Sequence, residues 1–221
     1  MSGIKKYISN MIFSFPPIKN KRKKYLKKIR SEYNYTGNTP SILCSTCIGG
    51  LIYNNLGLKF MSPTINLWIY SPDFVKFACN LKEYLASELE FLPLNNKYTD
   101  GAYPVGQLKD IMIHFNHFKT KEEALDKWNE RAKRIDFDNL YFITDDNGLK
   151  DEDILKMQKV ECKRAIVFTA TPKPQFGVTY WLKRYAKTGA MGEYSVRDLD
   201  GFREFEKSFD YVKWLNGDKI F

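Results

Sequence analysis

The residues best suited to nucleophilic chemistry in this sequence are Cys47 and its two histidines, His114 and His117. Cys47 follows a short strand-like stretch and precedes Gly49 and Gly50, a pattern that predicts a strand-to-helix junction. A thiol at a helix N-terminus can have a lowered pKa, and paired glycines let a ligand approach the backbone. We therefore predict a nucleophilic Cys47 with a histidine as its base. The alternative is a small buried cysteine at a tight turn.

The two histidines differ in their expected roles. His114 and His117 lie three residues apart at the end of the apolar run 111–115, which predicts a buried strand. Residues at this spacing point to opposite faces of an extended strand, so we expect only one to reach a shared site. His117 lies nearer the strand end and is the predicted acid or base. For His114, a buried, hydrogen-bonded structural role is an equal alternative.

A helix is predicted directly after the histidines. Thr120 and Glu123 have the spacing of a capping box, and Trp128 belongs to the apolar stripe that follows. Arg131 and Arg134 flank that stripe and can grip a phosphate or carboxylate, so we place them with Trp128 in the predicted substrate-binding set. As an alternative, the two arginines pair with acidic neighbours at the surface beside a buried Trp128.

Asp145 and Asp146 follow the apolar run 140–144. In many glycosyltransferases an acidic pair after a strand holds a divalent metal and a sugar diphosphate, and carboxylates suit Mg²⁺ or Mn²⁺. The sequence Asp-Asp-Asn-Gly is also ordinary turn chemistry, which we favour. We predict no defined metal-ligand set, and the cofactor stays unknown, with Mg²⁺ or Mn²⁺ and a sugar nucleotide as the candidates.

The four cysteines do not predict disulfides or structural zinc. The sequence has no secretory signal pattern, and disulfides are rare in reducing compartments. Cys44 and Cys47 form a lone C-x-x-C without a second pair or a suitably spaced histidine.

Length and composition predict one packed domain. The chain has 221 residues, of which 43% are hydrophobic and 15% aromatic. The sequence has no apolar run of the roughly 18 residues that a membrane span requires. We expect a cytoplasmic protein with an N-terminal arm, residues 1–35, and a single α/β domain, residues 36–221.

The positive charge is concentrated in the arm. Residues 1–30 contain ten Lys or Arg and no Asp or Glu, which leaves 25 basic against 26 acidic residues in the remainder. A nearly neutral body argues against nucleic acid binding. Basic residues mixed with apolar ones favour an anionic membrane surface, at the inner face of the plasma membrane. A solvated or disordered leader is the equal alternative.

The order of elements predicts an α/β fold. Strands are expected at 41–45, 64–70, 111–115, 140–144 and 164–169, and helices at 51–56, 71–89, 120–135, 151–159 and within 197–215. Stretches 94–106 and 171–192 are expected to be mainly loop. This alternation predicts a mainly parallel sheet of about five or more strands, flanked by helices in three layers. Sites in such sheets lie beyond the carboxyl ends of strands, which would bring the Cys, His and Asp residues to one crevice.

Several motifs together resemble a bacterial family of unknown function, number nineteen-nineteen, whose members are often named exopolysaccharide biosynthesis proteins. The motifs that carry the resemblance are Cys47-Ile48-Gly49-Gly50, Tyr103-Pro104-Val105-Gly106, His114-Phe115-Asn116-His117-Phe118, Asp138-Asn139-Leu140 and Phe209-Asp210-Tyr211-Val212. The resemblance implies an α/β fold and a setting in capsule or exopolysaccharide gene clusters. Family members tend to have Asn before and Trp after the cysteine, where this sequence has Thr46 and Ile48.

Motifs and resemblance together predict an enzyme of capsular or exopolysaccharide biosynthesis. It would transfer a sugar or substituent from an activated anionic donor, such as a sugar nucleotide or a lipid-linked sugar. Two other classes stay open: a non-catalytic scaffold that binds polymer precursors, and a Cys-His thiol hydrolase or amide-forming enzyme.

Overall fold

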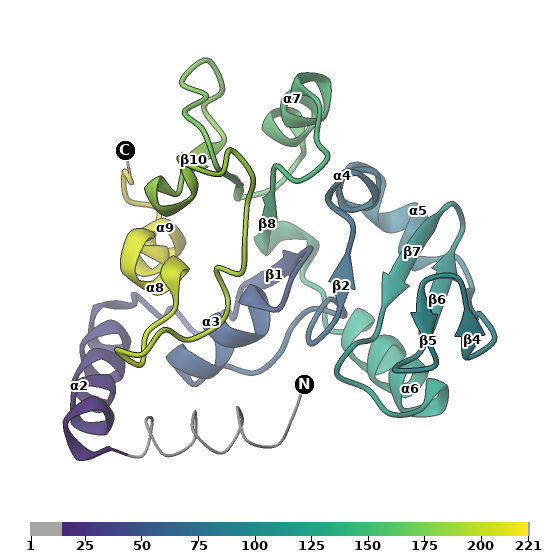
Figure 1. Ribbon diagram of the computed structural model, residues 1–221, viewed down its shortest axis with the longest axis horizontal. Helices are drawn as coiled ribbons and strands as arrows, with labels where there is room; N and C mark the ends of the chain where they lie inside the picture. The colour runs from purple at the N-terminus through teal and green to yellow at the C-terminus, as the bar shows by residue number, and fades with distance from the viewer. Residues whose placement is uncertain (1–14, 221) are drawn as a thin grey trace.

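The computed structural model describes residues 15–220 and contains two four-stranded sheets side by side (Figure 1). The elements around the first sheet are α2 (Pro16–Glu32), β1 (Ser41–Cys44), α3 (Ile48–Leu56), β8 (Leu140–Asp145), α7 (Asp151–Lys159), β9 (Arg164–Thr169), β10 (Thr179–Trp181), α8 (Glu204–Ser208) and α9 (Tyr211–Asn216). Those around the second are β2 (Trp68–Ile69), α4 (Ser71–Cys79), α5 (Leu81–Leu85), β3 (Leu89–Phe91), β6 (Val105–Leu108), β7 (Ile111–His114) and α6 (Lys121–Ala132). A small hairpin joins β4 (Asn95–Asn96) to β5 (Thr99–Asp100), and 3-10 turns lie at Phe137–Asn139 and Lys183–Tyr185.

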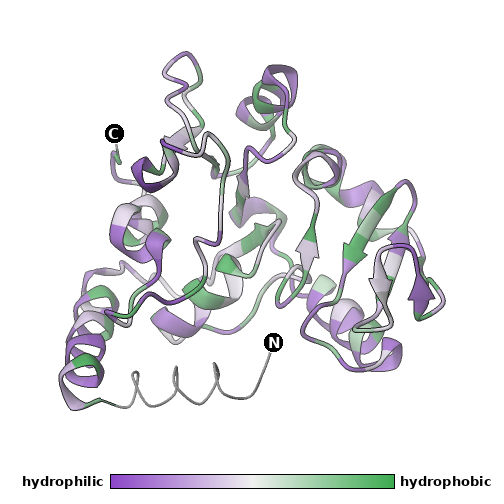
Figure 2. Ribbon diagram, in the orientation of Figure 1, coloured by the Kyte–Doolittle hydropathy of each residue, from purple (hydrophilic) through white to green (hydrophobic). Residues whose placement is uncertain are grey.

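The first sheet is parallel throughout, in the order β1-β8-β9-β10. Alternate side chains of its strands enter two different cores, as the two-residue period of a strand requires. Leu43 and Phe142 pack with α4 and α7 on one face, whereas Ile42 and Ile143 pack with α3 and α9 on the other. The strands are correspondingly apolar in Figure 2, where β1 and β8 are largely green.

The second sheet is antiparallel, in the order β2-β7-β6-β3. Only Lys109 and Asp110 separate β6 from β7, and Lys109 has a positive φ of 55°. So short a connection allows only a hairpin, because parallel neighbours need a long crossover. The two sheets meet near the end of β1, where the Ile69 amide donates to the Ser45 carbonyl at 2.9 Å.

The α/β class and the parallel pairing of β8 with β9 are confirmed. The expectation of a mainly parallel sheet of five or more strands differs from the structure, because 111–115 forms β7 in the antiparallel sheet. The predicted helix 71–89 is divided at Asn80 into α4 and α5. Strand β10 lies within the stretch expected to be loop, and the terminal helix is two short helices, α8 and α9.

Part of the predicted N-terminal arm, α2, packs against the domain, and residues 1–14 lie outside the described residues. The Arg22 guanidinium donates to both carboxylate oxygens of Glu206, each at 2.8 Å, and Tyr25 donates to the Tyr211 hydroxyl at 3.0 Å. These contacts tie α2 to α8 and α9. Within residues 15–220, every helix is too short or too polar to cross a membrane.

Candidate functional site

Cys47 lies at the junction between β1 and α3, as its sequence context predicts. It is the N-cap residue of α3, which begins at Ile48. Because β1 and β8 are parallel, with Cys44 opposite Ile143, the chain after β1 emerges at the same sheet edge as Asp145. The topology of the first sheet therefore fixes the thiol beside the end of β8.

His117 reaches the thiol from the second sheet. It follows β7 by three residues, in a turn closed by the Phe118 amide donating to the Phe115 carbonyl at 2.9 Å. Its Nε2 lies 3.2 Å from the Sγ of Cys47, within hydrogen-bond range for a sulfur atom. The structure thus brings together one thiol and one imidazole from segments 70 residues apart.

The pair opens into a cavity of about 570 Å³ between the two sheets and the segment 191–196. The polar residues that line it are Thr46, Cys47, Asn54, Asn66, Asn116, His117, Asp145, Asn147, Glu193 and Ser195. Trp68 adds an aromatic surface and is 38% exposed. Among the described lining residues there is no lysine or arginine, so the cavity is rich in amides and carboxylates.

The pKa of Cys47 is raised above its ordinary value, which corrects the expectation of a lowered one. Burial of the thiol is the larger cause, and the negative charge of Glu193 adds to it. Both causes disfavour the negatively charged thiolate. The resting residue is therefore a neutral thiol, and its proton must be removed as it reacts.

Asp145 forms part of the cavity wall and is itself buried. One carboxylate oxygen accepts from the Ser71 hydroxyl at 2.8 Å and the Asn147 amide at 3.1 Å, and the other accepts from the Tyr194 hydroxyl at 2.7 Å. Burial and the charge of Asp145 raise the pKa of Tyr194 far above its ordinary value. Asp145 thus anchors the loop that carries Tyr194 against the first sheet.

Asp146 does not line the cavity. Burial raises the pKa of Asp146, although a hydrogen bond from the Ala170 backbone opposes this effect. The contact from the Asn147 amide to Asp145, followed by Gly148 at a φ of 75°, is the turn chemistry that the sequence favoured. Of the two carboxylates, only that of Asp145 faces the cavity, and its oxygens accept hydrogen bonds from protein groups. Within residues 15–220, no cluster of three or more His, Cys, Asp or Glu has a metal-binding arrangement.

His114 is not among the residues that line the cavity, and its surroundings are those of a structural residue. It is 6% exposed, its Nδ1 lies 3.3 Å from the Tyr103 hydroxyl, and its ring centroid is 4.6 Å from that of Trp68. Burial lowers the pKa of His114, so its ring is neutral at neutral pH. His114 therefore matches the alternative of a buried structural histidine. Its contact with Trp68 positions one wall of the cavity.

Trp128, Arg131 and Arg134 also lie outside the cavity lining. Trp128 is 3% exposed in the core. Arg131 donates to the Ile65 carbonyl at 3.1 Å, and Arg134 donates to the carbonyl of Phe60 at 3.1 Å. Both arginines therefore hold the segment 60–65 that leads into the cavity, and Arg134 also pairs with Glu130, as the surface alternative predicted.

Gly49 and Gly50 have different roles. Gly49 packs on the first sheet, and a Cβ there would lie 2.9 Å from the Sγ of Cys44. Gly50 lines the cavity, and a Cβ there would lie 3.3 Å from the Oδ1 of Asn66. Gly50 is therefore the glycine at which a side chain would narrow the site.

Sequence reasoning missed several residues of the cavity wall. Asn54, Asn66, Trp68 and Glu193 come from a helix, a turn, an edge strand and a loop. The left-handed backbone of Asn66, with a φ of 62°, marks a turn but not a site. Trp68 lies in β2, and its exposure, which often marks a binding surface, is visible only in the structure.

Comparison with known proteins places the chain in a family. The model of a domain of unknown function, DUF1919, matches residues 18–216. The chain belongs to the DUF1919 family. An uncharacterized protein from Haemophilus influenzae is 32% identical over 200 residues, which cover 89% of this chain and 94% of that protein. The DUF1919 match begins within α2.

Proposed function

We propose that this DUF1919 protein is an enzyme that transfers a sugar or substituent during capsular or exopolysaccharide biosynthesis, through a covalent intermediate on Cys47. The single observation that carries the proposal is the distance of 3.2 Å between Sγ of Cys47 and Nε2 of His117 inside an open cavity. A thiol with a base in hydrogen-bond range is the basic requirement of cysteine nucleophilic catalysis.

The cavity chemistry favours a carbohydrate as the bound group. Side-chain amides of Asn54, Asn66 and Asn116 each offer two N–H donors and a carbonyl acceptor, which match the hydroxyl groups of a sugar. The exposed face of Trp68 offers an apolar plane against which the C–H face of a sugar ring can pack. A few polar groups around an aromatic wall are the usual means of orienting a small ligand.

The proposed reaction has two halves. The Sγ of Cys47 attacks the electrophilic carbon of the donor while Nε2 of His117 accepts the thiol proton. A carbon–sulfur bond forms, the bond from that carbon to the leaving oxygen breaks, and His117 passes the proton to this oxygen. An acceptor hydroxyl then attacks the same carbon and gives its proton to His117. The carbon–sulfur bond breaks, and the proton returns to Sγ.

Coupled proton transfer explains how a thiol with a raised pKa can react. Burial and Glu193 hold Cys47 neutral, so no free thiolate is exposed to adventitious electrophiles. Attack becomes favourable only when a donor occupies the cavity and His117 removes the proton in the same step. Asp145 takes no direct part, because its oxygens already accept hydrogen bonds from Ser71 and Tyr194.

The test replaces Cys47 and His117 separately in a bacterium that makes a surface polysaccharide with this protein. Cys47→Ala and His117→Ala should each abolish the dependent sugar or substituent, and Cys79→Ser is the matched control because Cys79 is an exposed thiol outside the cavity. Intact mass of Cys47 protein incubated with donor should show the adduct. Normal polymer from both folded cavity variants would refute the catalytic assignment.

A non-catalytic carbohydrate-binding protein is the second candidate. The raised pKa of Cys47 favours it, because a binding site needs no reactive thiol. This candidate predicts that Cys47→Ala leaves the polymer unchanged while Trp68→Ala lowers it. Inhibitors distinguish a metal-dependent transferase from the cysteine-dependent enzyme proposed here. EDTA would abolish the activity of the metal-dependent enzyme, and iodoacetamide would not.

A further inference from the structure

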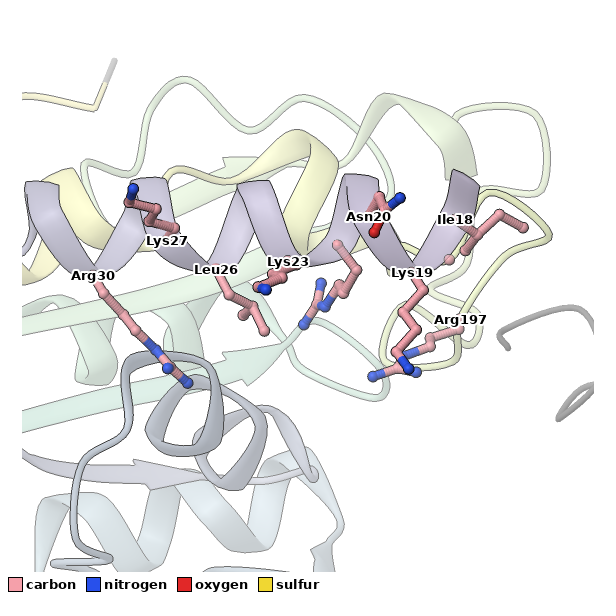
Figure 3. Close-up of a pocket in the computed structure, with 10 residues that line it drawn as sticks. Ile18, Lys19, Asn20, Lys23, Leu26, Lys27, Arg30 and Arg197 are labelled. Atoms are coloured by element: carbon pink, nitrogen blue, oxygen red, sulfur yellow. The ribbon is translucent and has the colours of Figure 1, made fainter. Parts of the chain in front are cut away.

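A second cavity, of about 730 Å³, lies along α2 and is lined by positive side chains (Figure 3). We call it the basic groove. Its cations are Lys19, Arg22, Lys23, Lys27, Arg30 and Arg197. Among the described lining residues there is no aspartate or glutamate. The groove therefore has the charge that the Cys47 cavity lacks.

Three of these cations, all lysines, make no side-chain contact with an acidic or polar group among residues 15–220. Arg22 is paired with Glu206, but Lys19, Lys23 and Lys27 have no side-chain hydrogen bond or ion pair with residues 15–220. The three lysines recur every four residues, so each is a neighbour of the next on the helix surface, although the Lys27 ammonium group points away from Lys19 in Figure 3. Like charges at this spacing repel one another, and an anion bound between them would relieve the repulsion.

The groove also contains an apolar surface. Ile18 and Leu26 line it, and both are half-buried. In Figure 3, Lys19, Leu26 and Arg30 extend from the same side of α2, and Arg197 comes from the facing loop. Cations beside an apolar surface suit an amphiphile better than a fully hydrated anion, because each part of the ligand then meets a matching surface.

The basic groove and the Cys47 cavity adjoin each other. Asn54 lines the cavity, and its backbone carbonyl accepts from Arg30, which lines the groove, at 3.3 Å. Val196 lines the cavity and the next residue, Arg197, lines the groove. The rise of about 1.5 Å per residue puts about 10 Å along α3 between Cys47, its N-cap residue, and Asn54. A sugar joined to a diphosphate can bridge a distance of this order.

We infer that the basic groove binds the diphosphate headgroup of a lipid-linked carbohydrate, whose sugar enters the Cys47 cavity. The lysines contact the phosphate oxygens, and Ile18 and Leu26 contact the first carbons of the lipid. This inference rests on the proposed function and assigns its substrate class. It also explains how a cavity without cations serves a negatively charged donor or acceptor.

Binding of farnesyl diphosphate, a soluble lipid diphosphate, to the full-length protein tests the inference by calorimetry. We expect it to bind at least about tenfold more tightly than inorganic diphosphate, because a few buried methylene groups supply that difference. The triple variant Lys19→Glu, Lys23→Glu, Lys27→Glu should lose at least about tenfold in affinity for both probes, since it reverses three charges at the site. Leu26→Asn should weaken farnesyl diphosphate and leave inorganic diphosphate unchanged.

The matched control is Lys121→Glu, Lys133→Glu, Lys159→Glu, which makes the same charge change at exposed lysines outside the groove. Equal loss in this variant, or unchanged binding in the groove variant, would overturn the inference. Equal affinity for the two probes would identify a site for free phosphates instead. The Cys47→Ser variant should bind both probes with the affinity of the wild type. This experiment therefore tests the groove independently of the catalytic proposal.

Discussion

Replacing Glu206 with alanine should detach α2 from the domain and strongly destabilise the protein. The Glu206 side chain is fully buried and accepts two hydrogen bonds from Arg22 at 2.8 Å. It also accepts from Asn55 at 2.7 Å and from the Arg203 backbone at 2.9 Å. One carboxylate therefore joins α2, α3 and α8, and its removal takes an acceptor from Arg22, Asn55 and Arg203 at once.

The magnitude follows from this burial. Removing one partner of a buried ion pair costs about 3–5 kcal/mol, because the remaining charge is left without compensation. Arg22 keeps 12% of its side chain exposed and can recover some hydration, so we expect about 3 kcal/mol for Glu206→Ala. The exposed pair Lys28–Glu32, with a distance of 3.8 Å, provides the control. Glu32→Ala should cost less than about 1 kcal/mol.

Urea unfolding at neutral pH measures both free energies. A loss below about 1 kcal/mol for Glu206→Ala would refute the reasoning, since a surface pair loses as much. The pH dependence gives a second measurement. Burial alone would raise the pKa of Glu206, but hydrogen bonds from Arg22 and the Arg203 backbone outweigh it and hold the pKa below 4.5. The stabilisation is therefore present above pH 4.5 and is lost as pH falls through the lowered pKa.

Two further predictions concern the site and its turn. Alkylation of Cys47 by iodoacetamide, followed by peptide mass spectrometry, should keep accelerating at pH values where an exposed thiol has levelled off, because its pKa is raised. Glu193→Gln should move this profile to lower pH by removing a negative charge, and an unmoved profile would contradict the assigned cause. Gly148→Ala should cost about 1–2 kcal/mol in urea unfolding, because φ is 75° and the added Cβ would collide with the Tyr70 hydroxyl. A neutral result would show that this turn relaxes freely.

Local sequence patterns predicted those features that depend on neighbouring residues. Thr120 caps α6 by accepting from the Glu123 amide at 3.2 Å, as half of the predicted capping box. Strands β8 and β9, with α7 between them, follow from apolar runs and helical spacing. The position of Cys47 at a strand-to-helix junction was predicted in the same way, because Gly49 and Gly50 mark the bend.

Features that depend on residues far apart in the chain could not be predicted from the sequence. The run 111–115 has the same composition whether its partners are parallel or antiparallel, so its sheet could not be assigned from its residues. Arg131 was expected to bind a ligand because an exposed arginine and a buried one look alike in sequence. Burial against the segment 60–65 decided its role, through the hydrogen bond to Ile65.

By itself, the sequence predicted the α/β class, many of the helices and strands, and one thiol and two histidines as candidate reactive groups, because backbone preference and side-chain chemistry are local. Only the tertiary structure decided that His117 meets Cys47 while His114 packs against Trp68. It also decided that burial and Glu193 raise the thiol pKa. Desolvation and charge effects on a pKa depend on atoms that folding brings close together. The separation of two residues along the chain does not predict whether folding will bring them into contact.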